Sequence, residues 1–328
     1  MRIFKEYGGT KELTVNVEQG PLSFAVPVSD FPEEFVLGAG NSIILINWNS
    51  DINEKNPEHV VLASEKFPQG NRWGYGNVDL QGRLWIATTN DYPLAYLHNY
   101  GILFSLNNKL VLEQKLQNLC SITGGFVWDR PMEENKRRSP PFKFYYADTP
   151  RKEVVVYDFA TRNGGLPKNR KELFSFKLHD TDDHPGRIAI DSRGWLWVPL
   201  IGGHKVIEFD PVRRMPDRVI DIPAAKVGAC TFGGAYLDIL YVSTIGYEYR
   251  ESHQHRPPGD EGGHIYAIHN LGVTGRPTEP YLMILTALPE NVRRAREHWA
   301  QLNGMIIPRM KTKSTKSKRS GGEGSSNS

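Results

Sequence analysis

Four side chains with metal-binding chemistry fall within five residues of this 328-residue chain: Asp180, Asp182, Asp183 and His184. Carboxylate oxygens and imidazole nitrogens are the ligands that divalent metal ions commonly take in proteins. Asp182, Asp183 and His184 are therefore a candidate metal site. The alternative is an acidic surface loop with no ligand.

A second pair of imidazoles, His253 and His255, is separated by one residue. Residues two apart in a β-strand point to the same face, so this pair could bind one metal ion together. The Arg256-Pro257-Pro258 sequence that follows favours an exposed loop instead.

The acidic segment leads into a strand–turn–strand pattern. Ile188 and Ile190 alternate with small or polar neighbours, and residues 191–194 (Asp-Ser-Arg-Gly) supply turn chemistry. Residues 196–198 (Leu-Trp-Val) are apolar, as in a buried strand. Residues 78–88 repeat the pattern 112 residues earlier. Half that interval is the size of a four-stranded blade with its loops, which predicts a β-propeller with one further copy between the two.

Composition excludes several classes of protein. The 31 Gly and 22 Pro residues are typical of a turn-rich globular chain, and a net charge of +3 is too small to indicate nucleic-acid binding. No apolar run reaches the roughly 20 residues that a membrane helix needs. Residues 1–6 lack the apolar core of a signal peptide, which predicts a cytoplasmic location.

Short strands with turn signals fill residues 1–288, which we predict to be one all-β propeller domain. Residues 289–304 are predicted to form a short C-terminal helix, because Pro289 can open it and Gly304 can end it. Residues 305–328 are expected to be a basic, disordered tail, which could serve as a nuclear-localisation or phosphate-binding segment or simply be solvated.

Four stretches, taken in order and spacing, carry a family resemblance. They are residues 71–83 (beginning Asn-Arg-Trp), residues 145–158, residues 190–211 and residues 230–275. Together they resemble the family of senescence marker protein (regucalcin), gluconolactonase and luciferin-regenerating enzyme. Yellow/royal-jelly and strictosidine-synthase propellers share the architecture, but residues 230–275 fit the first family better.

The resemblance implies a six-bladed β-propeller and hydrolysis of sugar lactones at a divalent metal, calcium or zinc. Residues 1–15 match the last part of the family's first blade, so that blade is expected to be incomplete and the chain N-terminally shortened. The family holds its metal with a Glu, an Asn and an Asp from three blades. The Glu strand would precede residue 1, the Asn position is Gly124 and the Asp position is Gly186.

Glycine offers no side-chain ligand, so lactone hydrolysis is expected to be weak or lost. On a chain extended by the missing strand, Gly124→Asn with Gly186→Asp is expected to restore metal binding. Asp182, Asp183 and His184 lie next to Gly186 and are the candidate substitute ligands.

Arg72 matches the arginine with which the family contacts its substrate; the alternative is a salt-bridged loop arginine. Two classes of function remain open. One is a lactonase-type hydrolase that acts on a sugar lactone. The other is a non-catalytic propeller that binds a small molecule or a protein partner at the channel mouth. Membrane and nucleic-acid partners are not expected.

The basic tail generates a first prediction. Residues 311–328 contain no apolar side chain to bury, so deleting them should leave the thermal unfolding midpoint unchanged in a circular-dichroism melt. A drop of several degrees would show that the tail packs against the folded protein.

Overall fold

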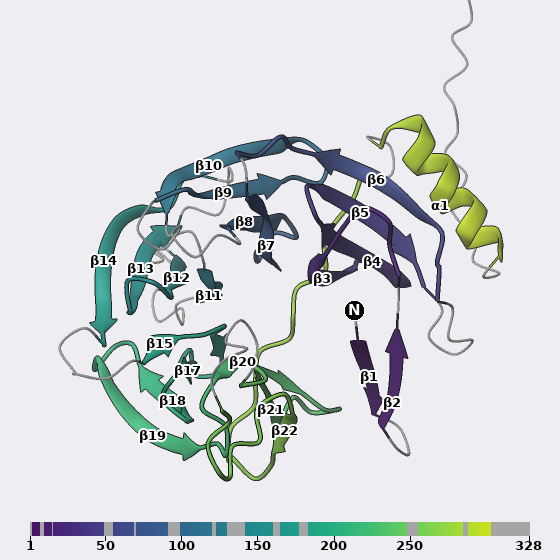
Figure 1. Cartoon of the computed structure of the whole chain (residues 1–328). Coiled ribbons are helices and arrows are strands. Elements are labelled where there is room, and N and C mark those ends of the chain that lie inside the picture. Colours follow the sequence, from purple (N-terminus) through teal and green to yellow (C-terminus); the bar gives the residue numbers. More distant parts are fainter. Residues whose placement is uncertain are drawn as a thin grey trace, which may run out of the picture.

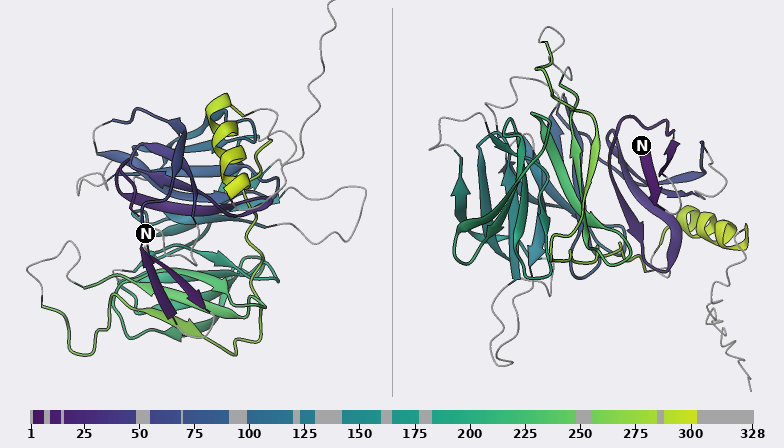
Figure 2. Two further views of the ribbon diagram at one scale, coloured as in Figure 1. Left: turned by 90° about the vertical axis from the view of Figure 1, so that its right-hand side faces the viewer. Right: turned by 90° about the horizontal axis from the view of Figure 1, so that it is seen from below.

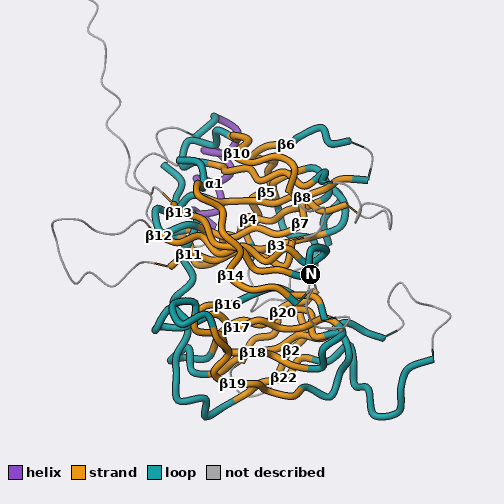
Figure 3. The backbone as a smooth tube through the Cα atoms, turned by 90° about the vertical axis from the view of Figure 1, so that its left-hand side faces the viewer, coloured by secondary structure: helices purple, strands orange, loops and turns teal. Residues whose placement is uncertain are grey.

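The computed structural model of the chain describes a ring of β-sheets with one helix at its edge (Figure 1, Figure 3). The residues that it describes are 2–6, 10–14, 16–48, 55–68, 70–90, 99–119, 123–129, 142–159, 165–176, 183–247, 255–284 and 288–302. The predicted all-β propeller arrangement with a short C-terminal helix is confirmed. The tail, residues 305–328, lies outside the described residues, and the division into domains at residues 288 and 304 stays a prediction.

Five antiparallel sheets, here named blades A to E, follow one another along the chain. Blade A contains β3 (Leu22–Val28), β4 (Phe31–Ala39), β5 (Ser42–Asn47) and β6 (His59–Ser64). Blade B contains β7 (Asn71–Val78), β8 (Leu84–Asn90), β9 (Gly101–Leu106) and β10 (Leu112–Leu119). Blade C contains β11 (Thr123–Asp129), β12 (Phe142–Asp148), β13 (Glu153–Phe159) and β14 (Lys168–Ser175).

Blades D and E depart from the four-stranded plan. Blade D contains β15 (His184–Pro185), β16 (Ala189–Ile190), β17 (Leu196–Ile201), β18 (Lys205–Asp210) and β19 (Met215–Asp221). Both β15 and β16 pair with β17, so they are two halves of one interrupted inner strand. Blade E contains β20 (Val227–Gly233), β21 (Ile239–Thr244) and β22 (Ile265–Ile268).

The predicted count of six blades is wrong, because the described residues form five. Strands β1 (Arg2–Glu6) and β2 (Thr10–Thr14), which we assigned to an incomplete first blade, form a separate two-stranded sheet. This sheet lies in the sector between blades E and A (Figure 1, Figure 2). A blade needs an inner strand at the channel, and neither β1 nor β2 pairs with one.

The repeated sequence pattern corresponds to the hairpin that joins the two innermost strands of blades B and D, and blade C is the expected copy between them. In blade D the buried carboxylate of Asp191 accepts hydrogen bonds from the Arg193 guanidinium at 2.7 Å and from the indole of Trp197 at 3.3 Å. In blade B the Asp79 carboxylate accepts the corresponding bond from Trp85 and a bond from Arg83, which stands four residues after the aspartate instead of two. Each buried carboxylate is thus compensated by several donors, which fixes the turn and anchors the tryptophan.

Apolar side chains fill the interfaces between consecutive blades. Four separate clusters lie between blades A and B, B and C, C and D, and D and E. Trp73, Trp85 and Trp197 are fully buried in the first, second and fourth of these clusters. They therefore belong to the core between blades, where aromatic rings bury a large area.

After β22 the chain crosses the ring to reach blades A and B (Figure 1). We call residues 269–284 the crossing segment. Thr274 O accepts a hydrogen bond from Ser192 N at 2.8 Å, and Leu282 N donates one to Gly82 O at 2.9 Å. Both contacts are made to the hairpin turns of the repeated pattern, so the crossing segment lies at that end of the channel.

Helix α1 (Glu290–Leu302) follows the crossing segment and lies on the outside of blade A (Figure 1, Figure 2). No helix within the described ranges has both the length and the apolar character needed to span a membrane.

A buried ion pair attaches α1 to blade A. Arg296 Nε donates to Glu34 Oε2 at 2.8 Å, and both side chains are almost fully buried. The Arg296 guanidinium also lies 4.0 Å from the ring centroid of Phe31. Burial raises the pKa of Glu34 to about 7, with Arg296 opposing the shift, and burial also lowers the pKa of Arg296. Each charge is therefore costly to bury without the other.

This pair generates a second prediction. Arg296→Ala should lower the free energy of unfolding by about 3 kcal/mol or more, because it removes one partner of a buried pair and its packing. Arg294→Ala is the matched control on the same helix, since the Arg294–Glu290 pair is exposed and should contribute less than about 1 kcal/mol. Urea unfolding followed by tryptophan fluorescence measures both. Equal effects of the two substitutions would contradict the assignment of Arg296 as the anchor.

Candidate functional site

Glycines interrupt the inner strands of four neighbouring blades. The register between the inner strand and its neighbour shifts at three places: between Trp73 and Tyr75 in β7, between residues 123 and 126 in β11, and between residues 227 and 229 in β20. The skipped residues include Gly74, Gly124 and Gly228. In blade D the gap between β15 and β16 begins with Gly186. These breaks turn backbone groups sideways, out of their own sheet.

Backbone hydrogen bonds then link the inner strands of different blades. Ile188 N donates to Gly124 O of blade C at 3.0 Å. Arg187 N donates to Gly228 O of blade E at 2.9 Å, and Cys230 N returns a bond to Arg187 O at 3.1 Å. Blades C, D and E therefore meet directly through their main chains at the level of these glycines.

The same contacts leave no room for side chains at Gly124 and Gly186. A Cβ atom on Gly124 would lie 2.5 Å from Gly186 O and 2.7 Å from Pro185 O. A Cβ atom on Gly186 would lie 2.4 Å from Gly228 O. All these neighbours are backbone atoms, which cannot rotate away as a side chain can, so any larger residue would have to push strands apart.

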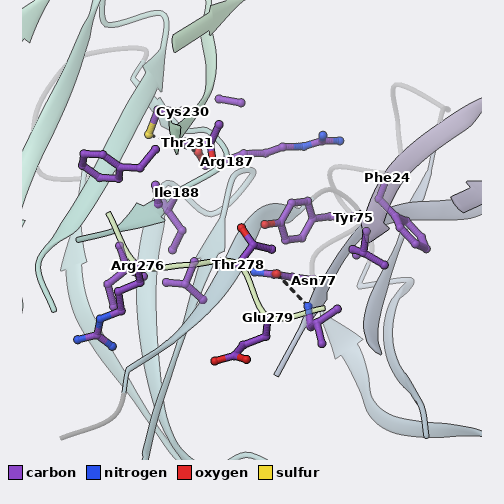
Figure 4. A pocket seen from close by; sticks show the side chains of 18 of the residues that line it. Phe24, Tyr75, Asn77, Arg187, Ile188, Cys230, Thr231, Arg276, Thr278 and Glu279 are labelled. Carbon is purple, nitrogen blue, oxygen red and sulfur yellow. Dashed lines mark hydrogen bonds between the residues drawn. The ribbon is translucent and has the colours of Figure 1, made fainter. Parts of the chain in front are cut away.

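The residues that follow these glycines alternate between large and small around the channel: Tyr75, Gly125, Arg187 and Ala229. The Tyr75 ring lies over Gly125, and the Arg187 guanidinium carbon lies 5.3 Å from the Tyr75 ring centroid. Both side chains line a central cavity (Figure 4). Two large side chains therefore occupy the part of the channel that the small residues leave free.

The cavity has a volume of about 1000 Å³, enough for a small organic ligand. Inner-strand residues of all five blades contribute to its wall: Phe24, Asn77, Val127, Ile188 and Thr231 are examples. The crossing segment contributes Arg276, Pro277, Thr278 and Glu279.

Two arginines of the cavity differ in their partners. Arg276 Nη2 lies 2.6 Å from Asp129 Oδ1, so its charge is compensated. Arg187 is exposed to the cavity although it lies deep inside the protein, and no carboxylate among the described residues pairs with it. Burial lowers the pKa of Arg187, Tyr75 opposes that shift, and the nearby positive charge of Arg72 adds to it. Burial also raises the pKa of Tyr75.

Comparison with known proteins identifies the family. The family model described as SMP-30/Gluconolactonase/LRE-like region matches residues 5–246, which is more than half of the chain. The chain belongs to the SMP-30/gluconolactonase/LRE-like family. The resemblance predicted from the sequence is thereby confirmed.

Individual members of the SMP-30/gluconolactonase/LRE-like family are similar along most of their length. A putative sugar lactone lactonase, YvrE, from Bacillus subtilis is 32% identical over 229 residues, covering 69% of this chain and 70% of that protein. Regucalcin from Xenopus laevis is 28% identical over 245 residues, covering 74% and 75%.

Solved structures of the family share the fold. A luciferin-regenerating enzyme superposes with a TM-score of 0.73 at 25% identity, covering 84% of this chain and 85% of its own. A regucalcin from Agrobacterium tumefaciens superposes with a TM-score of 0.64 at 14% identity, covering 84% and 83%. At that identity the second match shows the fold alone.

The predicted substitute metal ligands are only partly described. Asp182 lies outside the described residues, as do Asp180 and His253. His184 is half-buried, and its Nδ1 lies 2.9 Å from Thr149 O, so that nitrogen is engaged. In the described part of the chain, no three His, Cys, Asp or Glu side chains come together as a metal site. The positions predicted for the family's Asn and Asp ligands are occupied by Gly124 and Gly186, neither of which offers a side-chain ligand, and their correspondence to the family's metal site stays a prediction.

Arg72, the predicted substrate contact, lies in β7 and is half-buried. Its Nη1 donates to Trp73 O at 3.1 Å, and it is not among the described residues that line the central cavity. Its role toward a substrate stays a prediction.

The sequence analysis did not single out Tyr75 or Arg187 as cavity residues. A signal was available for both, because each directly follows a glycine in an inner strand: Gly74 or Gly186. In a bulged strand the residue after the bulge can change the face to which it points. Arg187 directly follows Gly186, the position predicted for the family's Asp ligand.

The close approach of the inner strands generates a third prediction. Gly186→Ala should lower the free energy of unfolding by about 1–3 kcal/mol, because its Cβ meets the Gly228 carbonyl. Gly228→Ala is the matched control in the neighbouring blade, since its Cβ would lie 3.0 Å from the flexible Ile245 side chain. Denaturant unfolding of the two variants provides the comparison, and an equally mild effect of both would show that the strands separate easily.

Proposed function

We propose that this chain is a propeller that binds a small molecule in its central channel and whose metal-dependent lactone hydrolysis is weak or lost. The observation that carries the proposal is the enclosure of Gly124 and Gly186 by backbone atoms of neighbouring blades. Neither glycine offers a side-chain ligand, and the surrounding backbone leaves no space for a larger side chain at either position.

The chemistry of lactone hydrolysis explains why this enclosure matters. In metal-assisted ester hydrolysis the ion polarises the carbonyl oxygen and lowers the pKa of a bound water molecule. A hard cation such as calcium requires several oxygen ligands, and carboxylates supply most of the compensating charge. The inner strands of blades C and D present main-chain hydrogen bonds at this level instead. The geometry also argues against the expected recovery of metal binding by Gly124→Asn with Gly186→Asp, because both new side chains would clash.

A small polar ligand remains compatible with the site. The cavity is large enough for a sugar lactone, and its wall combines apolar surface with the polar groups of Tyr75, Asn77, Thr231 and Thr278. The relative that is 32% identical is named a putative sugar lactone lactonase, which supports this class of molecule as the ligand.

A lactonase with substitute ligands is the second candidate. Family membership favours it, and Asp183 and His184 lie next to Gly186 at the start of the interrupted inner strand. Because His184 Nδ1 contacts Thr149 O, this candidate requires a metal ion to be bound through the other ring nitrogen, Nε2.

The fourth prediction tests the proposed function. Purified protein dialysed against a chelator should show no high-affinity binding of calcium or zinc in isothermal titration calorimetry. Gluconolactone hydrolysis, followed as acid release, should not increase when either ion is added, because no described set of residues compensates its charge.

The variant Asp183→Ala separates the two candidates. Clear metal-stimulated turnover by the unmodified chain that Asp183→Ala abolishes would overturn the proposal and establish the substitute site. Metal-stimulated turnover that survives this substitution would also overturn the proposal that hydrolysis is weak or lost, and it would show that the metal binds at another site.

A further inference from the structure

We propose that Arg187 anchors an anion site in the central channel, which binds the carboxylate of a small hydroxy acid. This inference deepens the proposed function, since it rests on the channel being the ligand site and names the chemical class of the ligand. The guanidinium lines the cavity and is exposed to it.

The charges around Arg187 favour an anion. Asp129 pairs with Arg276 at 2.6 Å, so the Asp129 carboxylate is already engaged. Glu279 also lines the cavity, but its carboxylate points away from the Arg187 guanidinium, toward the opposite side (Figure 4). Among the residues that the structure describes, no acid forms an ion pair with Arg187.

The Arg187 side chain is exposed to the cavity, but the surrounding protein reduces the solvation of its charge. Desolvation lowers the pKa of Arg187, and the positive charge of Arg72 lowers it further. A cation that is exposed to an enclosed cavity and has no ion-pair partner among the described residues is stabilised by a bound anion.

The contact with Tyr75 leaves the donors of Arg187 available. The Arg187 Cζ atom lies 5.3 Å from the centroid of the Tyr75 ring, a cation–π contact with the aromatic group. Such a contact uses the charge of the guanidinium and none of its five N–H donors. No side-chain hydrogen bond of Arg187 to another described residue competes for them.

The geometry of guanidinium selects a carboxylate. Two parallel N–H donors match the two oxygens of a carboxylate, and one uncompensated positive charge matches a monoanion better than a phosphate dianion. The hydroxyl groups of Tyr75, Thr231 and Thr278 line the same cavity and suit a ligand that carries hydroxyls of its own. The volume of about 1000 Å³ admits an acid of the size of an open-chain sugar acid.

The fifth prediction tests the anion site with gluconate as the probe. Isothermal titration calorimetry in a chelator-containing buffer should show gluconate binding to the unmodified chain, with no measurable binding of glucose and weaker binding of inorganic phosphate. Arg187→Gln should weaken gluconate binding about tenfold or more, because it removes a charge-assisted bidentate contact.

The control is Arg213→Gln. Arg213 is exposed and is not among the described residues that line the cavity, so its substitution should leave the affinity for gluconate unchanged. Thermal melts establish that each variant is folded. If Arg187→Gln does not fold, Arg187→Lys replaces it, since lysine keeps the charge but loses the bidentate geometry and should still weaken binding. Gluconate binding that is absent, or equal in Arg187 variants and control, would overturn the anion site.

The two proposals fail in different measurements. Absence of gluconate binding together with absence of metal-stimulated hydrolysis overturns the anion site alone. Metal-stimulated hydrolysis together with Arg187-dependent gluconate binding overturns the loss of activity alone. Phosphate binding tighter than gluconate binding would overturn the choice of carboxylate.

Discussion

Main-chain hydrogen bonds between neighbouring inner strands, from Arg187 and Ile188 to Gly228 and Gly124, determine the shape of the channel. They require glycine at the points of closest approach, because a Cβ atom at Gly124 or Gly186 would meet a carbonyl oxygen at 2.5 Å or less. At this level the strands of blades C, D and E are joined by main-chain hydrogen bonds, and these glycines present no side chain that could bind an ion. The rest of the site follows from this constraint.

The residue after the glycine in two of the inner strands, Tyr75 or Arg187, lines the channel. Tyr75 and Arg187 extend into the cavity where Gly125 and Ala229 leave space. Among the described residues, Arg187 and Glu279 both present a charge to the cavity without an ion-pair partner, and the Glu279 carboxylate points away from the Arg187 guanidinium (Figure 4). The guanidinium charge has the sign of a metal ion but different geometry, since it donates hydrogen bonds to a planar anion and cannot act as a Lewis acid. Under the proposed function, the family fold would bind a related ligand with altered chemistry.

The C-terminal part of the chain stabilises the ring from two sides. The crossing segment binds the hairpin turns of blades B and D and places Arg276 opposite Asp129 inside the channel. Helix α1 then attaches to the outside of blade A through Arg296 and Glu34. Both attachments join segments distant in sequence: the crossing segment is joined to blades B and D, and α1 is joined to blade A.

The sequence by itself determined the family, the all-β propeller architecture, the repeated hairpin and the position of the C-terminal helix. These features depend on local patterns: alternating apolar residues, Asp-x-x-Gly turns, and Pro289 before the helix. Gly124 and Gly186 could also be identified as positions without a ligand. The number of blades could not be obtained in this way, because it depends on how strands pair across the ring.

Only the tertiary structure decided what replaces the missing ligands. The distance from Gly186 to the Gly228 carbonyl and the direction of the Arg187 side chain depend on bulges in three different blades. Whether a charge is compensated also depends on residues far apart in the chain, as in the pairing of Asp129 with Arg276. A linear sequence records the identity of these residues, whereas the folded ring brings their backbone and charges together.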